Sequence, residues 1–302
     1  MRIVFFGTPA FAAFSLKKLK ESGKNIVAVV TAPDKPAGRG MHLHQSEVKK
    51  TATELGLPVL QPEKLKSEEF VTQIRQLDAD LGIVIAFRML PEIIWSMPKL
   101  GTFNLHASLL PQYRGAAPIN HAIIQGETTT GVTTFFLRHE IDTGDIVLQE
   151  SVKIEPDDNA GSLHDKLMIT GAELVVKTVN LVETDHVISK PQVLMGNEKP
   201  APKIFRDFCR LSEKDSVIQN HNKIRGLSPY PAAWVETRQG PMKVLQSRIF
   251  ESAHIDCEES FFVFQNRLLF QCHDGFLELL QIQPAGKAAM TARDFINGQK
   301  NK

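Results

Sequence analysis

Two short stretches of the chain carry side chains that could act together on one reacting group. Asn104 and His106 precede a turn at 108–111 that contains a proline, and Asp142 lies further along in an Asp-Thr-Gly sequence. An amide can donate to a developing oxyanion, whereas an imidazole and a carboxylate can move protons. This combination predicts proton-coupled acyl-group chemistry.

Each of these residues also has a purely structural interpretation. A single histidine near a strand end is more often structural than catalytic, and Asp-Thr-Gly is ordinary turn chemistry. The catalytic hypothesis is favoured because side chains alternate along a strand, so Asn104 and His106 should share one face while Leu105 packs into the sheet. Pro111 and Gly115 then favour a backbone that a ligand can approach closely.

The segments that must position these residues alternate along the chain between short apolar runs, which predict strands, and stretches with apolar residues at helical spacing, which predict helices. We expect strands at 2–6, 25–31, 58–60, 81–85, 102–105, 131–136 and 145–152. We expect helices at 11–20, 46–55, 67–77, 118–125 and 160–183. The alternation predicts an α/β fold, a Rossmann-like and mostly parallel sheet with helices on both faces. Ligands of such sheets bind beyond the carboxyl ends of the strands, where Asn104 and His106 would lie.

A proline-rich stretch divides the chain. We expect a catalytic domain at 1–188, a linker at 189–206 and a second domain at 207–302. After a helix at 215–225, short strands at 233–236, 242–250, 261–265, 267–272 and 276–283 predict a small OB-like β-barrel.

Composition narrows the class of protein. The net charge of +1 gives no global basic field, but a local patch could still bind nucleic acid. We expect a cytoplasmic protein, because the chain shows neither a signal peptide nor a run that could span a membrane. The single glycine after the first strand disfavours a dinucleotide fingerprint. No metal is expected, since His42 and His44 lack nearby acidic or cysteine partners.

Four motifs together resemble those of the folate-dependent formyltransferases, and within that family the branch that formylates methionyl-tRNA. The first is Phe6-Gly7-Thr8-Pro9 and the second is Asp34-Lys35-Pro36-Ala37-Gly38-Arg39-Gly40. The third is the two-part signature at 104–119 and 141–145, and the fourth is Ile224-Arg225-Gly226-Leu227-Ser228-Pro229-Tyr230. The resemblance implies a Rossmann-like domain with an OB-like tRNA-binding domain, and a catalytic trio of Asn104, His106 and Asp142.

The resemblance also implies the substrates and their contacts. The donor would be 10-formyltetrahydrofolate and the acceptor methionyl-initiator tRNA, with no metal and a monomeric enzyme. The folate contacts carry over to Ser108, Leu109, Leu110, Pro111, Phe87, Met89 and Leu90. The tRNA contacts carry over to the basic loop residues Lys35 and Arg39, although a loop rich in glycine and proline can also be a solvated connection.

Two segments depart from the family pattern. Family members commonly carry a methionine- or acid-bearing segment before Asp-x-Gly, where this chain reads Phe-Leu-Arg-His-Glu at 136–140, and Phe87-Arg88 replaces the usual Tyr-Gly, which affects the folate slot. Two other functions stay open on the sequence: a formyltransferase acting on an amino sugar nucleotide, and a non-catalytic folate- or RNA-binding module.

Overall fold

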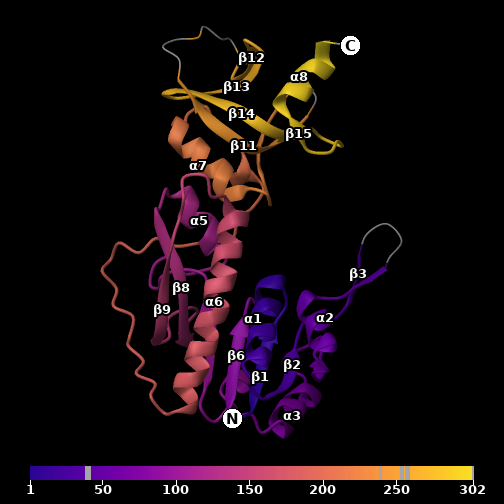
Figure 1. Cartoon of the computed structure of the whole chain (residues 1–302), viewed down its shortest axis with the longest axis vertical. Coiled ribbons are helices and arrows are strands. Elements are labelled where there is room, and N and C mark those ends of the chain that lie inside the picture. The colour runs from indigo at the N-terminus through magenta and orange to yellow at the C-terminus, as the bar shows by residue number, and fades with distance from the viewer. Residues whose placement is uncertain (38–41, 238–239, 252–254, 256–258, 301–302) are drawn as a thin grey trace. The chain divides into compact units, whose positions relative to one another are not determined.

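In a computed structural model of the chain, residues 1–37, 42–237, 240–251, 255 and 259–300 are described (Figure 1). They form two compact units. The first unit contains Met1–Arg114, Gly131–Val152 and Asp165–Pro200, and the second contains Gly115–Thr130, Lys153–His164 and Ala201–Lys302. These units are defined by contacts in space, and each combines several separate segments of the chain. They therefore do not test the predicted domain boundaries at 188 and 206, which stay a prediction.

The first unit is built on a seven-stranded sheet of order β5-β2-β1-β6-β7-β8-β9. Its strands are β1 (Ile3–Gly7), β2 (Ile26–Val30), β5 (Val59–Leu60), β6 (Leu81–Ile85), β7 (Thr102–His106), β8 (Thr129–Phe136) and β9 (Ile146–Lys153). The strands from β5 to β7 pair in parallel, and β8 is antiparallel to β7. The strand order reverses between β1 and β6, which is where a doubly wound sheet binds its ligands.

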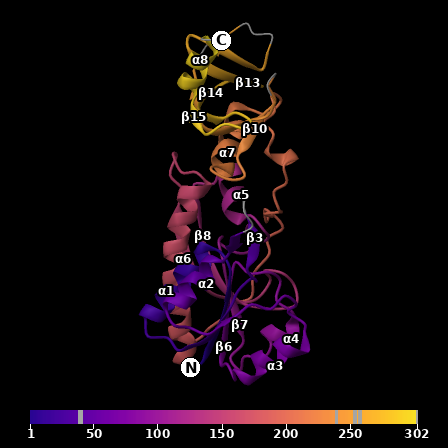
Figure 2. The same ribbon diagram turned by 90° about the vertical axis from the view of Figure 1, so that its right-hand side faces the viewer.

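Helices cover both faces of this sheet, as Figure 2 shows. On one face lie α1 (Ala10–Glu21), α2 (Glu47–Glu54) and α6 (Ala160–Glu183), and on the other lie α3 (Glu68–Gln76) and α4 (Glu92–Trp95). Serines begin two of them: Ser46 accepts from the Lys49 N–H and Ser67 from the Phe70 N–H. Such caps satisfy backbone donors that a helix start leaves free.

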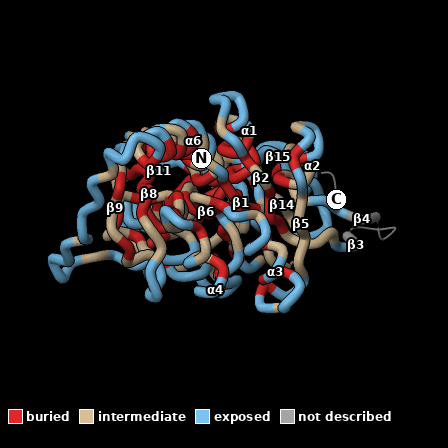
Figure 3. The backbone as a smooth tube through the Cα atoms, turned by 90° about the horizontal axis from the view of Figure 1, so that it is seen from below, coloured by how far each residue is buried: buried red, intermediate tan, exposed pale blue. Residues whose placement is uncertain are grey.

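The central strands are buried on both sides. Every residue of β1 and β6 is buried, and Figure 3 shows these strands in the buried colour. Continuous apolar runs are typical of parallel strands with helices on both faces. The predicted Rossmann-like α/β class is confirmed.

One segment differs from the sequence prediction. The basic segment that contains Lys35, rich in glycine and proline, was predicted to be a loop, yet β3 (Lys35–Ala37) and β4 (His42–His44) pair as a two-stranded antiparallel ladder. Composition argued against a strand because proline cannot donate to a ladder, but a two-stranded ribbon tolerates proline at its edge. Arg39 lies outside the described residues.

The second unit is an antiparallel sheet with helices. Its strands are β10 (Ala233–Val235), β11 (Met242–Phe250), β12 (Phe261–Phe264), β13 (Arg267–Cys272), β14 (Gly275–Gln283) and β15 (Met290–Thr291). They follow the order β10-β11-β14-β13-β12, with β15 paired to β14. This confirms the small C-terminal β domain. The short elements α4 and β15 were not predicted, and neither was helix α8 (Ala292–Lys300), although its Ile296 is buried in the core of this unit.

Helices α5 (Pro118–Ile124) and α7 (Val217–Leu227) also belong to this unit. Ser216 and Gln219 form a capping box that begins α7. A Cβ at Gly226 would lie 2.5 Å from Ile124 Cγ1 and 2.9 Å from the Asn120 carbonyl, so only glycine allows this approach. Across the described parts of the chain, no helix is both long and apolar enough to cross a membrane.

Candidate active site

The carboxyl end of β7 places Asn104 and His106 at one edge of the sheet of the first unit. In the ladder with β8, Asn104 lies opposite Phe135 and His106 opposite Thr133. Between them, Leu105 turns the other way and lies against Gly171 of α6, where a Cβ would come within 2.9 Å of Leu105 Cδ2. The alternation expected from the sequence is therefore present.

The structure brings His106 and Asp142 together. The distance from His106 Nδ1 to Asp142 Oδ2 is 3.8 Å, and the two side chains are 8% and 10% exposed. On the other side of the ring, His106 Nε2 lies 2.9 Å from the carbonyl oxygen of Tyr113. A carbonyl can only accept, so Nε2 is the donor in this hydrogen bond, and the other ring nitrogen, Nδ1, faces the Asp142 carboxylate.

Asn104 is available for a ligand. It is partly buried, and none of the hydrogen bonds found among the described residues involves its amide. It precedes His106 by two residues on the same strand face. A polar amide beside a nearly buried imidazole and carboxylate is the arrangement that oxyanion stabilisation with proton transfer requires.

The turn after His106 is held by a buried hydroxyl. Thr133 Oγ1 donates to the Ser108 carbonyl at 2.6 Å and accepts from the Leu110 N–H at 3.1 Å. Gln149 Nε2 donates to both the Leu110 carbonyl, at 2.9 Å, and Thr133 Oγ1, at 3.0 Å. The Ser108 hydroxyl itself donates to the Gln112 carbonyl. Ser108 thus shapes the turn, whose Leu109 and Pro111 are two of the predicted folate contacts.

The other predicted folate residues follow β6. Leu90 is buried and packs in one apolar cluster with Phe87 and Leu137, whereas Met89 is 74% exposed. Arg88 turns back, with its guanidinium donating to the Glu63 and Pro62 carbonyls and lying 5.7 Å from the Phe87 ring centre. The Phe87-Arg88 departure therefore leaves an apolar surface at this end of the sheet.

The basic loop is only partly described. Lys35 is exposed in β3. Asp34 accepts hydrogen bonds from Lys49 and Gln61, and these, with the Lys49 bond first, lower the pKa of its carboxyl. Lys49 is paired in this way, whereas Lys35 has no ion-pair partner among the residues described. The predicted contact Arg39 falls outside the described residues.

Sequence reasoning missed several groups that complete the site. They are the Tyr113 carbonyl, Arg114, Thr133, Gln149 and Gln192. Tyr113 and Arg114 stand inside the signature, which could have drawn attention to them. The other three lie on β8, on β9 and in the proline-rich stretch, and their roles depend on tertiary contacts that no local pattern reveals.

The second unit contains a different kind of surface, which we call the basic–aromatic segment: Lys203, Phe205, Arg206, Phe208, Arg210, Lys223 and Trp234. Arg206 and Arg210 lie 5.7 and 5.6 Å from the Trp234 ring centre. Lys203 lies 5.5 Å from the ring of Phe205, which is 65% exposed. Cations over exposed aromatic rings suit contacts with phosphates and bases.

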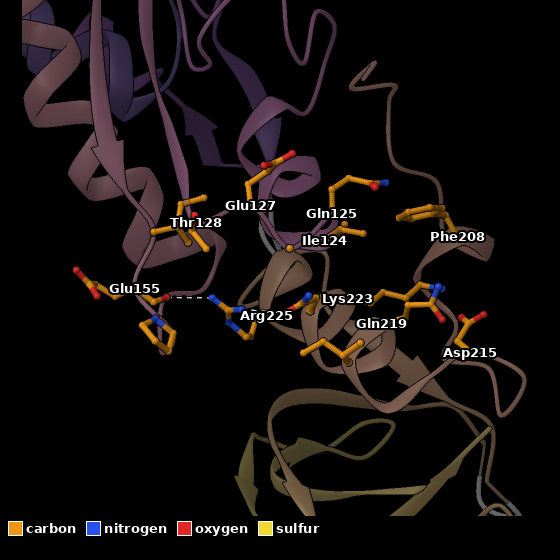
Figure 4. Close-up of a pocket in the computed structure, with 15 residues that line it drawn as sticks. Ile124, Gln125, Glu127, Thr128, Glu155, Phe208, Asp215, Gln219, Lys223 and Arg225 are labelled. Atoms are coloured by element: carbon orange, nitrogen blue, oxygen red, sulfur yellow. Dashed lines mark hydrogen bonds between the residues drawn. The ribbon is translucent and has the colours of Figure 1, made fainter. Parts of the chain in front are cut away.

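A pocket of about 670 Å³ in the second unit borders this segment (Figure 4). Phe208 and Lys223 line it, and burial lowers the pKa of the Lys223 ammonium. Arg225 is turned to the opposite wall, where it donates to the Glu155 and Asp158 carbonyls. The pocket carries both signs of charge and none of the residues predicted as catalytic.

The fold and the site define a class: an α/β protein with an imidazole–carboxylate pair at the edge of a doubly wound sheet and a second unit built on an antiparallel sheet. Comparison with known proteins narrows this class. The formyl transferase family model matches residues 1–179, and the model of the formyl transferase C-terminal domain matches residues 203–300.

Relatives extend over nearly the whole chain. A methionyl-tRNA formyltransferase from Parabacteroides distasonis is 50% identical over 99% of this chain and 96% of its own length. A methionyl-tRNA formyltransferase from Flavobacterium johnsoniae is 44% identical over 99% of this chain and 96% of its own length. A sugar 3N-formyl transferase structure, in the presence of dTDP and 5-N-formyl-THF, has a TM-score of 0.69 at 19% identity, covering 95% of this chain and 99% of that one. The chain belongs to the formyl transferase family, in the branch of the methionyl-tRNA formyltransferases.

Proposed function

We propose that the protein transfers the formyl group of 10-formyltetrahydrofolate to the free α-amine of methionyl-initiator tRNA. The observation that carries this proposal is the approach of His106 to Asp142 at the end of the strand that also carries Asn104. Membership of the methionyl-tRNA branch supports tRNA as the acceptor over an amino sugar nucleotide, whose enzymes share only the fold. A reaction that prepares initiator tRNA belongs in the cytoplasm, and we expect a monomer to perform it.

In this mechanism the amine attacks the formyl carbon directly. Asn104 donates to the oxyanion that develops, and one such donor is worth about 3–4 kcal/mol in comparable sites. The tetrahedral intermediate collapses by breaking the bond between the formyl carbon and the folate nitrogen. His106 donates a proton from Nδ1 to that leaving nitrogen, because Nε2 faces the Tyr113 carbonyl, and Asp142 takes up the proton of the attacking amine through water. Asp142 orients the imidazole and stabilises its charged form.

The apolar residues after β6 and β8 fit a folate ring. Phe87, Leu90 and Leu137 form a packed floor, and Met89 and Ile141 are 74% and 63% exposed on the loops that follow the two strands. Large exposed apolar side chains beside polar catalytic groups are what a ligand with a flat ring would cover. The turn at 108–111 would supply main-chain contacts, with Leu109, Leu110 and Pro111 against the donor.

For the tRNA we propose two contact regions. Lys35 and Arg39 would bind phosphates beside the acceptor end, and the basic–aromatic segment of the second unit would bind the backbone elsewhere. Arg and Lys contacts of this kind position a nucleic acid without reading its sequence. Stacking of bases on Phe205 or Trp234 would add about 1–3 kcal/mol for each base.

The test is a formylation assay with three acceptors: charged initiator tRNA, charged elongator tRNA and an amino sugar nucleotide. We expect turnover with charged initiator tRNA, and single-turnover rates at least a hundredfold lower for folded His106→Ala. Formylation of the sugar alone would replace the proposed acceptor. Wild-type rates for His106→Ala would remove the proposed catalytic role. An Arg39→Ala variant should weaken tRNA use and leave folate binding unchanged.

A further inference from the structure

The loop that carries Asp142 adopts a conformation that needs support. Asp142 has a φ of +55°, in the left-handed region. Two residues later, a Cβ at Gly144 would lie 1.6 Å from the Phe136 carbonyl oxygen, so the backbone there is pressed against the end of β8. Groups that hold this loop therefore decide where the Asp142 carboxylate lies.

Gln192 is such a group. Its Nε2 donates to the carbonyl oxygens of Asp142 and Gly144, both at 2.9 Å. The chain reaches this position because Lys190 and Ile146 exchange backbone hydrogen bonds of 2.8 and 2.9 Å. From 188 to 197 every residue except Gln192 is exposed, so this side chain alone enters the unit from that stretch.

The other end of the Gln192 amide is held as firmly. Its Oε1 accepts from Arg114 Nε at 3.1 Å and Nη2 at 2.5 Å. Arg114 directly follows Tyr113, whose carbonyl accepts from His106 Nε2. A single neutral amide thus connects the backbone that holds the histidine with the backbone that holds the aspartate.

We propose that Gln192 is a positioning residue that, with Arg114, sets the separation of His106 and Asp142. This inference rests on the proposed function of that pair. Gln192 contacts main-chain oxygens and a guanidinium, so it acts through Asp142 and not on the substrates. Its amide suits this task because it offers two donors and an acceptor without adding charge beside the carboxylate.

The experiment measures kcat and both KM values for the full chain and for Gln192→Ala, Asp142→Asn and the double variant. We expect Gln192→Ala to lower kcat about tenfold with KM values within twofold. Asp142→Asn should lower kcat further, and the double variant should match Asp142→Asn alone. Thermal unfolding of each variant verifies that it is folded.

Two more variants separate positioning from general order of the segment. Val193, the residue after Gln192, is 74% exposed, so Val193→Ala should keep kcat. Gln192→Glu, which retains an acceptor for Arg114 but loses both donors, should be as slow as Gln192→Ala. Equal losses for Val193→Ala, or rescue by Gln192→Glu, would overturn the positioning role.

The remaining outcomes are equally decisive. A wild-type kcat for Gln192→Ala, or losses that multiply in the double variant, would overturn the inference and leave the proposed site intact. A wild-type kcat for Asp142→Asn would instead refute the proposed function of the pair, and the inference with it.

Discussion

The site of the first unit and the basic–aromatic segment of the second unit hold their polar groups in opposite ways. Around His106 and Asp142, neutral amides, hydroxyls and carbonyls fix each backbone turn, and the side chains are nearly buried. In the second unit, charged side chains lie over aromatic rings, several of them exposed. Chemistry demands fixed distances, whereas a long nucleic acid demands many adaptable contacts.

The first way to test this contrast is to remove the charge of Asp142. In Asp142→Asn the imidazole loses its carboxylate partner while the shape of the side chain is kept. We expect kcat to fall about 10²–10⁴-fold, the range of acid–base catalysis, with little change in the tRNA dissociation constant. Single-turnover formyl transfer and direct tRNA binding measure the two quantities. A loss seen only in binding would contradict the contrast.

A second variant removes the hydroxyl that holds the 108–111 turn. Thr133→Val leaves the Ser108 carbonyl and the Leu110 N–H without their buried partner, at a cost of about 1–3 kcal/mol. We expect kcat/KM for the folate donor to fall about ten- to a hundredfold. Steady-state kinetics with varied donor concentration provides the measurement.

The matched control for that variant is Thr130→Val on the same strand. The Thr130 hydroxyl is buried and has no hydrogen-bond partner among the residues described, so its loss should be neutral or stabilising. If the two valine variants behaved alike, the Thr133 hydrogen bonds would not be what holds the turn.

The sequence predicts those features of the two regions that depend on neighbouring residues, and it misses those that depend on contacts between residues far apart in the chain. The buried strands β1 and β6 and the alternation of Asn104 with Leu105 are local patterns, and they were predicted correctly. Gln192 acts on a loop 50 residues earlier in the chain, and nothing in the proline-rich stretch marks it. The β3–β4 ladder was missed because the high glycine and proline content of the segment argued against strands, and local sequence does not reveal that the two strands pair. The stacking of Arg206 and Arg210 on one ring likewise needs the fold, since mixed charges along the sequence indicate only a solvated surface.

A third prediction addresses the adaptable region. Arg206→Ala and Arg210→Ala each remove one cation from Trp234, and each should raise the tRNA dissociation constant about three- to tenfold. The dependence of binding on salt should weaken, because fewer counterions are released. The kcat at saturating tRNA should be unchanged. Titrations at two or more salt concentrations measure this, with Lys20→Ala, an exposed lysine of α1, as the control.

A loss of kcat at saturating tRNA in either arginine variant would show that the second unit takes part in the chemical step. Losses equal to those of Lys20→Ala would show that any surface cation contributes as much. Either result would end the division between a fixed site and an adaptable binding surface.

The smallest expected effect concerns pH and the stability of the second unit. His121 is 6% exposed, its Nε2 donates to the Pro202 carbonyl at 3.0 Å, and burial lowers its pKa from the ordinary value of 6.5. The unfolded chain therefore binds the proton more readily than the folded one. The contribution of His121 to the free energy of unfolding is full above about pH 6.5 and falls as the pH drops below it.

His121→Gln keeps a donor for the Pro202 carbonyl but cannot titrate, so its melting temperature should fall less between pH 7.5 and 5.5 than that of the parent chain. His221, whose pKa is also lowered mainly by burial, gives the same sign and should retain its share in the variant. Thermal unfolding at the two pH values measures the difference. An equal fall in both proteins would mean that burial does not lower the pKa of His121 in the folded chain.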